Sequence, residues 1–324
     1  MQVVTLMRRT DRARPAQGVR ASNIPYNEKS VHSPDCWRSS GTIASDSNDK
    51  PISGETHIVP QPLPPSPAAV AESLRAAYRS GPIPPLRAAL EPTDADGAYA
   101  VQEINTRFWQ DQGRRIVGRK IGLTAKAVQA QLGVDQPDYG VLFADMEILD
   151  GGTLPVDAVL QPKAEAEIAF VLKADITDPE ADAEAVRAAV GHIVPAIEIV
   201  DSRIADWKIS FADTVADNGS SAFFVLGGPE HAIDDVDLYS CGMVMTVNDA
   251  IVSVGAGAAC LGHPLNAAAW LARVMAARGT PLRKGDIMLT GALGPMAALA
   301  PGDHVDVTIG GIGRCRFTYG EDKK

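Results

Sequence analysis

The sequence has few of the features that mark membrane, nucleic-acid-binding or disulfide-stabilised proteins. None of its apolar runs approaches the roughly 18 uninterrupted residues that a membrane span needs. Its 324 residues include 30 Lys and Arg against 40 Asp and Glu, a formal net charge of −10, which argues against nucleic acid or an anionic membrane as the main partner. The four cysteines lie far apart without a CxxC spacing, so neither a zinc knuckle nor a disulfide framework is indicated. Reduced thiols in the cytoplasm are the simplest interpretation.

The chain divides by composition into an irregular start and a well-patterned remainder. Residues 1–67 are rich in Ser, Pro, Asn and Arg, lack any period and end in VPQPLPPSP, which predicts a disordered extension with a proline-rich linker. Order is expected to begin near Ser66, and residues 68–150 are expected to form a small N-terminal α/β subdomain, with helices over 68–80 and 94–113 followed by a short strand. With 45% hydrophobic residues, the chain can bury a full-sized core.

Residues 151–320 are β-rich and are expected to form the larger, catalytic domain. Asn248-Asp249 lies between two alternating runs and predicts a hairpin turn, and a second hairpin is expected around Gly310-Gly311. One helix interrupts the strands, with Pro264 near its first turn and Gly279 after its last. The pattern predicts an α+β architecture, with a small helical N-terminal subdomain and a larger β-rich domain that a helix covers.

Two glutamates stand at the head of an apolar run, PKAEAEIAFVL, that otherwise is typical of a sheet interior. Because side chains alternate along a strand, Glu165 and Glu167 would point together from one face. Two adjacent carboxylates repel each other. Either that face is solvated and the charges are ordinary, or a positive group lies between them.

A third carboxylate, Glu198, interrupts the apolar strand in VPAIEIVDSR about thirty residues later. Alone it could be a solvated edge residue, but three carboxylates facing one way on neighbouring strands would form an oxygen site suited to Mg²⁺ or Mn²⁺. Such an ion could bind a 2-oxo acid through its carboxylate and keto oxygens and polarise the carbonyl. Lys120 in GRKIGLT is the candidate to balance the excess negative charge.

Seven short segments follow one another along the chain: GRKIGLT, PDYGVLF, EAEIAFVL, AIEIVDSRIADWK, ADNGSSAFFVLG, GAACLGHPLNAAAWLA and TGALGPM. Taken in order, they resemble the 2-hydroxypenta-2,4-dienoate (2-keto-4-pentenoate) hydratases of the fumarylacetoacetate hydrolase superfamily. The resemblance runs from about residue 70 to 319, and it does not extend to the N-terminal segment. Each motif is short, but seven in one order are highly specific.

The resemblance implies a mixed β-sandwich or β-roll of the fumarylacetoacetate hydrolase C-terminal type, holding Mg²⁺ or Mn²⁺. The metal ligands would be Glu165, Glu167 and Glu198. A cation would then lie between the adjacent carboxylates of Glu165 and Glu167. Lys120 and Asp138 would serve the proton transfers. The substrate contacts would be Ser220, with Asn218 and Ser221 beside it.

The reaction implied is the addition of water to 2-hydroxypenta-2,4-dienoate (2-oxopent-4-enoate) to give 4-hydroxy-2-oxopentanoate, in meta-cleavage degradation of aromatic compounds. The alternative is the sister enzyme 4-oxalocrotonate (2-oxo-3-hexenedioate) decarboxylase, and a non-catalytic partner subunit of such an enzyme also stays open. TGALGPM favours the hydratase, because the decarboxylases carry a TGGLT-like sequence there. The family further implies a homo-oligomer and leaves open a complex with a pathway decarboxylase or aldolase.

Individual residues also have ordinary structural interpretations. Lys120 could be an exposed lysine at a strand end, and Asp138 could cap the turn before Tyr139-Gly140. Arg203 is expected to pair with a local acid rather than with substrate. His263, before Pro264, is expected to serve the start of a helix.

Overall fold

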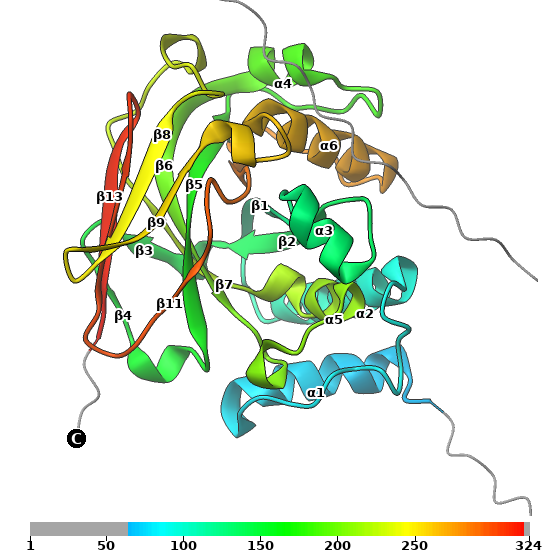
Figure 1. The fold of residues 1–324 in the computed structure, drawn as a ribbon. Helices are drawn as coiled ribbons and strands as arrows, with labels where there is room; N and C mark the ends of the chain where they lie inside the picture. Colours follow the sequence, from blue (N-terminus) through cyan, green and yellow to red (C-terminus); the bar gives the residue numbers. More distant parts are fainter. Residues whose placement is uncertain (1–63, 321–324) are drawn as a thin grey trace, which may run out of the picture. The chain divides into compact units, whose positions relative to one another are not determined.

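The computed structural model describes residues 64–320, so the predicted disordered extension lies outside the described residues up to position 63. The described chain has the α+β fold predicted from the sequence (Figure 1). Its helices are α1 (Pro67–Ser80), α2 (Ala95–Asp111), α3 (Lys126–Leu132), α4 (Ala183–Ala189), α5 (Phe211–Ala216) and α6 (Pro264–Ala277), with the single 3₁₀ turns η1 (Ala144–Met146), η2 (Val156–Ala158), η3 (Ala205–Trp207), η4 (Asn218–Ser220), η5 (Ile233–Asp235) and η6 (Gly257–Ala259). None of the described helices is long and apolar enough to cross a membrane.

Local capping explains where the N-terminal helices begin. The Ser66 side chain accepts a hydrogen bond from the Ala69 N–H at 3.3 Å, and Pro67 takes the first helical position of α1. The Asp94 carboxylate accepts from the Gly97 N–H at 2.9 Å and caps α2. Both helices therefore start where the sequence predicts them.

The larger sheet carries the site. Its strands run in the order β2-β1-β10-β5-β6-β7-β3, and β11 pairs with one end of β5. The two longest strands, β5 and β6, pair antiparallel along their length, whereas β1 pairs parallel with β10. The bounds are β1 (Ile116–Gly122), β2 (Asp138–Phe143), β3 (Glu147–Leu149), β5 (Pro162–Leu172), β6 (Val190–Asp201), β7 (Ser221–Leu226), β10 (Ile287–Leu289) and β11 (Ala297–Ala298). The division into domains at residue 150 stays a prediction; β1, β2 and β3, which precede it, belong to this same sheet.

A second, five-stranded sheet packs against β6 and β7, while most helices lie on the other side of β5 and β6 (Figure 1). It contains β4 (Thr153–Leu154), β8 (Gly242–Val247), β9 (Ala250–Ala256), β12 (His304–Ile309) and β13 (Gly313–Tyr319). The β8–β9 hairpin turns at Asn248-Asp249 and the β12–β13 hairpin at Gly310-Gly311, which confirms both predictions. The main core includes Ile168, Phe170, Ile197 and Ile199 of the larger sheet and Met243, Val305 and Phe317 of the smaller one.

Candidate metal centre and active site

Three carboxylates meet on one face of the larger sheet, as the sequence predicts. Alternation along β5 puts Ala164, Ala166 and Ile168 in the main core and turns Glu165 and Glu167 to the other face. In the β5–β6 ladder Glu198 stands directly opposite Glu165. One carboxylate oxygen from each glutamate lies within 4.8 Å of the others.

The burial of this cluster makes it costly without a cation. Glu167 and Glu198 are fully buried, while Glu165 is partly exposed. Burial and then the neighbouring Glu198 raise the pKa of Glu165 to about 7, and the same two causes raise the pKa of Glu167 well above its usual value. Within the described part of the chain, Glu167 Oε1 and Glu198 Oε1 accept no hydrogen bond, and the neighbour of Glu198 Oε2 is the Lys120 ammonium group. Buried, unsatisfied carboxylate oxygens fit a hard divalent cation.

Lys120 joins the cluster from β1. Its side chain is only 3% exposed, and its Nζ lies 3.3 Å from Glu198 Oε2. Burial alone would lower the pKa of Lys120, but the four carboxylates around it together raise it above the usual value: Glu198 and Asp138, followed by Glu165 and Glu167. The alternative of an exposed lysine at a strand end is therefore wrong.

Asp138 approaches Lys120 from the neighbouring strand. It is the first residue of β2, is 1% exposed and stands opposite Gly122 of β1. Burial raises the pKa of Asp138, against the effects of Lys120, the Gly122 backbone and the Thr214 hydroxyl. Gly122 permits this approach, because a Cβ atom there would meet the Asp138 carboxylate. Asp138 thus lies in a strand beside Lys120, and the turn-cap interpretation does not apply.

The three predicted substrate contacts lie together around η4 and the start of β7. The Ser220 hydroxyl lies 3.3 Å from Asp217 Oδ2 and 3.3 Å from Thr214 Oγ1. The Asn218 amide is bound to the backbone of Val141. Ser221 opens β7 with its side chain beside Glu198. Their contact with substrate stays a prediction.

Two supporting residues were not identified from the sequence. The Gly291 N–H donates to Glu167 Oε2 at 2.7 Å and so orients that carboxylate, and Thr214 lies against Asp138. Gly291 has a φ of 112°, and a Thr-Gly pair directly after a short strand is the signal that could have marked it. Nothing in FADTVA marks Thr214, because its partner is distant in sequence.

Two other residues have the structural roles predicted for them. His263 caps α6, with its Nδ1 accepting from the Leu265 N–H at 3.1 Å. Arg203 is fully buried and pairs with Asp217 through its Nε, 2.6 Å from Asp217 Oδ1. Neither is one of the residues that form the carboxylate cluster.

Comparison with known proteins agrees with this arrangement. The family model described as "Fumarylacetoacetate (FAA) hydrolase C-terminal" matches residues 116–319. "2-keto-4-pentenoate hydratase 2" of Dechloromonas aromatica is 56% identical over 249 residues, which cover 76% of this chain and 95% of the relative. "2-hydroxyhexa-2,4-dienoate hydratase" of Comamonas testosteroni is 40% identical, over 77% of this chain and 94% of the relative.

A solved structure is similar over the same region. The 4-oxalocrotonate decarboxylase from Pseudomonas putida G7, complexed with magnesium and adipate, superposes with a TM-score of 0.74 and 36% identity. The match covers 78% of this chain and 97% of that protein. The family match and these identities lead to one conclusion: the chain belongs to the fumarylacetoacetate hydrolase family.

Proposed function

We propose that the protein is a metal-dependent hydro-lyase that adds water to 2-hydroxypenta-2,4-dienoate and forms 4-hydroxy-2-oxopentanoate, in meta-cleavage degradation of aromatic compounds. The observation that carries the proposal is the buried cluster of three glutamates with Lys120 and Asp138. It occurs in a chain that is 56% identical to a protein named 2-keto-4-pentenoate hydratase.

Glu165, Glu167 and Glu198 would hold the metal, Mg²⁺ or Mn²⁺, since carboxylate oxygens are the ligands that these ions prefer. When bound, the ion would act as a Lewis acid toward the C1 carboxylate and C2 oxygen of the substrate. The hydrogen bond from Gly291 fixes Glu167, and the backbone pairing of β5 with β6 fixes Glu165 against Glu198. The larger sheet and the backbone next to it therefore position the three carboxylates that would bind the metal.

Lys120 and Asp138 would move the protons. One proton leaves the C2 hydroxyl and another is delivered to C5, which gives a 2-oxo-3-ene with an electrophilic C4. Water then adds at C4 and C3 is protonated. Lys120 and Asp138 would share these transfers as general acid and base: neighbouring carboxylates raise the pKa of Lys120, and burial raises the pKa of Asp138.

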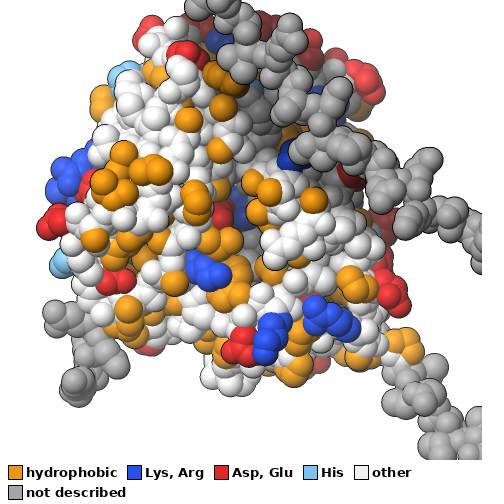
Figure 2. All heavy atoms as spheres, in the orientation of Figure 1, with side chains coloured by type: hydrophobic (Ala, Val, Ile, Leu, Met, Phe, Trp, Pro, Cys, Tyr) orange, Lys and Arg blue, Asp and Glu red, His pale blue; other side chains and the backbone are white. Residues whose placement is uncertain are grey.

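Figure 2 shows a few acidic and basic atoms recessed among hydrophobic side chains near the middle of the face shown, and the charged groups Lys120, Asp138, Glu167 and Glu198 of the site are buried. Apolar surroundings exclude water from the charged groups and strengthen their interaction. Ser220, Asn218 and Ser221 remain the predicted substrate contacts. The cytoplasmic location, the homo-oligomer and the complex with a pathway enzyme remain predictions from the sequence.

Two substrates distinguish the candidate reactions. The purified protein with Mg²⁺ should deplete 2-hydroxypenta-2,4-dienoate, followed by its ultraviolet absorbance, and should release no CO₂ from 2-oxo-3-hexenedioate. CO₂ release would instead favour the decarboxylase, in line with the similarity to the P. putida decarboxylase structure. Turnover of neither substrate would leave the non-catalytic subunit.

Glu165→Gln should weaken Mg²⁺ binding at least about tenfold, because even residues that only support a metal ligand typically contribute 10- to 100-fold. Glu165 is the partly exposed member of the cluster, so its replacement should be tolerated by the fold. Isothermal titration with Mg²⁺ gives the affinity, and turnover at saturating Mg²⁺ tests whether activity follows.

Glu147→Gln is the matched control for this prediction. Glu147 is exposed at the start of β3 in the same sheet, so its variant loses the same charge away from the site. It should bind Mg²⁺ as the unaltered protein does. Equal affinities for both variants, or full activity in excess EDTA, would remove the glutamates from metal binding.

A further inference from the structure

The turn η4 adopts an unusual backbone conformation beside the site. Asn218, Gly219 and Ser220 have φ angles of 60°, 61° and 51°, three left-handed residues in succession. L-amino acids other than glycine adopt this region at a cost in energy, and runs of such residues are rare. The turn therefore needs interactions that hold it in place.

The Asn218 side chain supplies two of them. Its Oδ1 accepts from the Val141 N–H at 2.7 Å, and its Nδ2 donates to the Val141 carbonyl at 3.0 Å. β2 is the last strand at this end of the sheet order. The amide of Asn218 thus bonds to the edge of β2 as the backbone of a neighbouring strand would.

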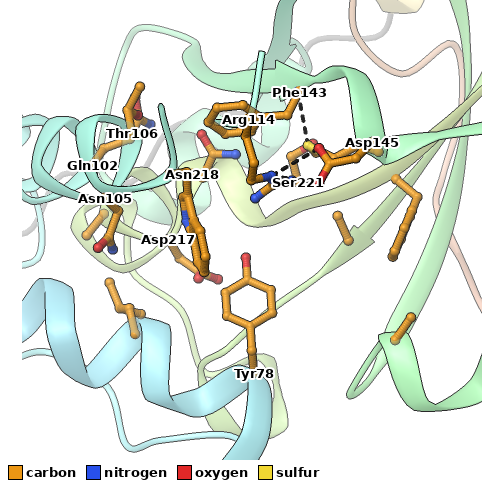
Figure 3. Close-up of a pocket in the computed structure, with 17 residues that line it drawn as sticks. Tyr78, Gln102, Asn105, Thr106, Arg114, Phe143, Asp145, Asp217, Asn218 and Ser221 are labelled. Atoms are coloured by element: carbon orange, nitrogen blue, oxygen red, sulfur yellow. Dashed lines mark hydrogen bonds and ion pairs between the residues drawn. The ribbon is translucent and has the colours of Figure 1, made fainter. Parts of the chain in front are cut away.

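One side of the turn η4 borders a cavity. The turn therefore depends more strongly on the two hydrogen bonds between Asn218 and Val141. The cavity has a volume of about 330 Å³ and is lined by Asp217, Asn218 and Ser221 on the side of the turn. Figure 3 shows Tyr78 pointing into this cavity from α1, opposite Asn218.

The front of the turn lies against Lys120. A Cβ atom at position 219 would lie 3.1 Å from Lys120 Cε and 3.3 Å from Cδ, so the lysine side chain runs along the backbone of the turn. On another side, a Cβ atom at Gly122 would lie 3.0 Å from Lys120 Nζ. The lysine is thus confined between the turn and β1, with its Nζ 3.3 Å from Glu198.

We propose that Asn218 is a positioning residue, which acts on the reaction through Lys120. Its two bonds to Val141 hold the left-handed turn against the lysine and so fix the Nζ. The inference rests on the proposed function, because Asn218 can affect the reaction in this way only if Lys120 takes part in proton transfer. It gives Asn218 a role other than the substrate contact predicted from the sequence.

Asn218→Gly tests the proposal, because glycine accepts the left-handed backbone but lacks both side-chain bonds. We expect kcat for hydration to fall about tenfold, since small displacements of a reacting group are costly, while KM and Mg²⁺ affinity change less than about twofold. Asn248→Gly is the control: Asn248 is also left-handed, with a φ of 51°, but lies in the β8–β9 hairpin. It should keep full activity.

A double-mutant cycle with Lys120→Ala separates this role from others. In the Lys120→Ala background, Asn218→Gly should change kcat less than about twofold, because the group that it positions is absent. An equal loss in both backgrounds, or a higher KM with unchanged kcat, would overturn the proposal. If Asn218→Gly fails to bind Mg²⁺, Asn218→Asp, which can still accept from the Val141 N–H, takes its place in the cycle.

The cycle is interpreted only if the unaltered protein hydrates 2-hydroxypenta-2,4-dienoate. Absence of that activity would contradict the proposed function itself. Activity without coupling between the two positions would contradict only the role of Asn218.

Discussion

Lys120→Ala is expected to lower kcat at least about 10²-fold, the usual scale for a general acid or base, without weakening Mg²⁺ binding. The Lys120 Nζ lies beside Glu198 and close to Asp138, so its loss removes one of the two groups proposed to move protons. It also removes a positive charge from the neighbourhood of the three glutamates, which cannot disfavour a cation there. Steady-state kinetics and Mg²⁺ titration on the same preparation measure both quantities.

Lys120→Arg distinguishes proton transfer from charge balance. A guanidinium keeps the positive charge but cannot release a proton near neutral pH. We therefore expect Lys120→Arg to be nearly as inactive as Lys120→Ala. Near-normal kcat in Lys120→Arg would remove Lys120 from the chemistry. Lys173→Ala, an exposed lysine just after β5, is the neutral control.

Asp138→Asn should give a loss of similar size, and the two losses should not add. If Lys120 and Asp138 act in one relay, removing the second group after the first should cost little more. Full additivity in the double variant would instead indicate two independent roles.

Arg203→Met should destabilise the protein by about 3–5 kcal/mol, because it leaves a buried carboxylate without its partner. Arg203 is fully buried, its Nε lies 2.6 Å from Asp217 Oδ1, and its Nη2 donates to the Asp217 carbonyl at 2.7 Å. A loss of this size is a large part of the stability of an ordinary domain. Denaturant unfolding measures it.

The loss of stability caused by Arg203→Met should grow as the pH rises from about 6 to 8. Burial raises the pKa of Asp217 to about 6, and Arg203 opposes this rise, so removing Arg203 should raise the pKa further. Above pH 6 the folded variant would then hold a proton that the unfolded chain has released, and stability falls with pH wherever the folded state binds more protons. Arg107→Met, which breaks only the exposed pair with Glu103, should cost less than about 1 kcal/mol at every pH. A deficit independent of pH would mean that Asp217 stays ionised without Arg203.

The sequence predicts the parts of this protein that depend on local pattern. Ser66, Asp94 and Pro264 mark helix starts through interactions within a few residues, and the structure has helices there. Glu165 and Glu167 share a face because alternation along a strand is strict. This alternation alone could not show whether the face that carries Glu165 and Glu167 is solvated or buried. Glu198 on the next strand resolved this choice, since its register brings it opposite Glu165.

Residues whose role comes from distant contacts could not be identified in this way. Thr214 reaches Asp138 and Asn218 reaches Val141 across separations of more than seventy residues. Neither contact leaves a periodic trace in the sequence. The left-handed turn is equally hidden, because only one of its three residues is a glycine.

The position of β10 affects the order in which the active site can be assembled. This three-residue strand is the only one between β1, which carries Lys120, and β5, which carries Glu165 and Glu167, yet it comes more than a hundred residues after both. Until β10 inserts, the two halves of the larger sheet have no backbone pairing with each other, and Gly291 cannot reach Glu167. Long-range pairings of this kind close late and slowly. During synthesis the chain beyond Gly291 therefore has to leave the ribosome before the complete site can form, with Gly291 bonded to Glu167 and β1 joined to β5 through β10.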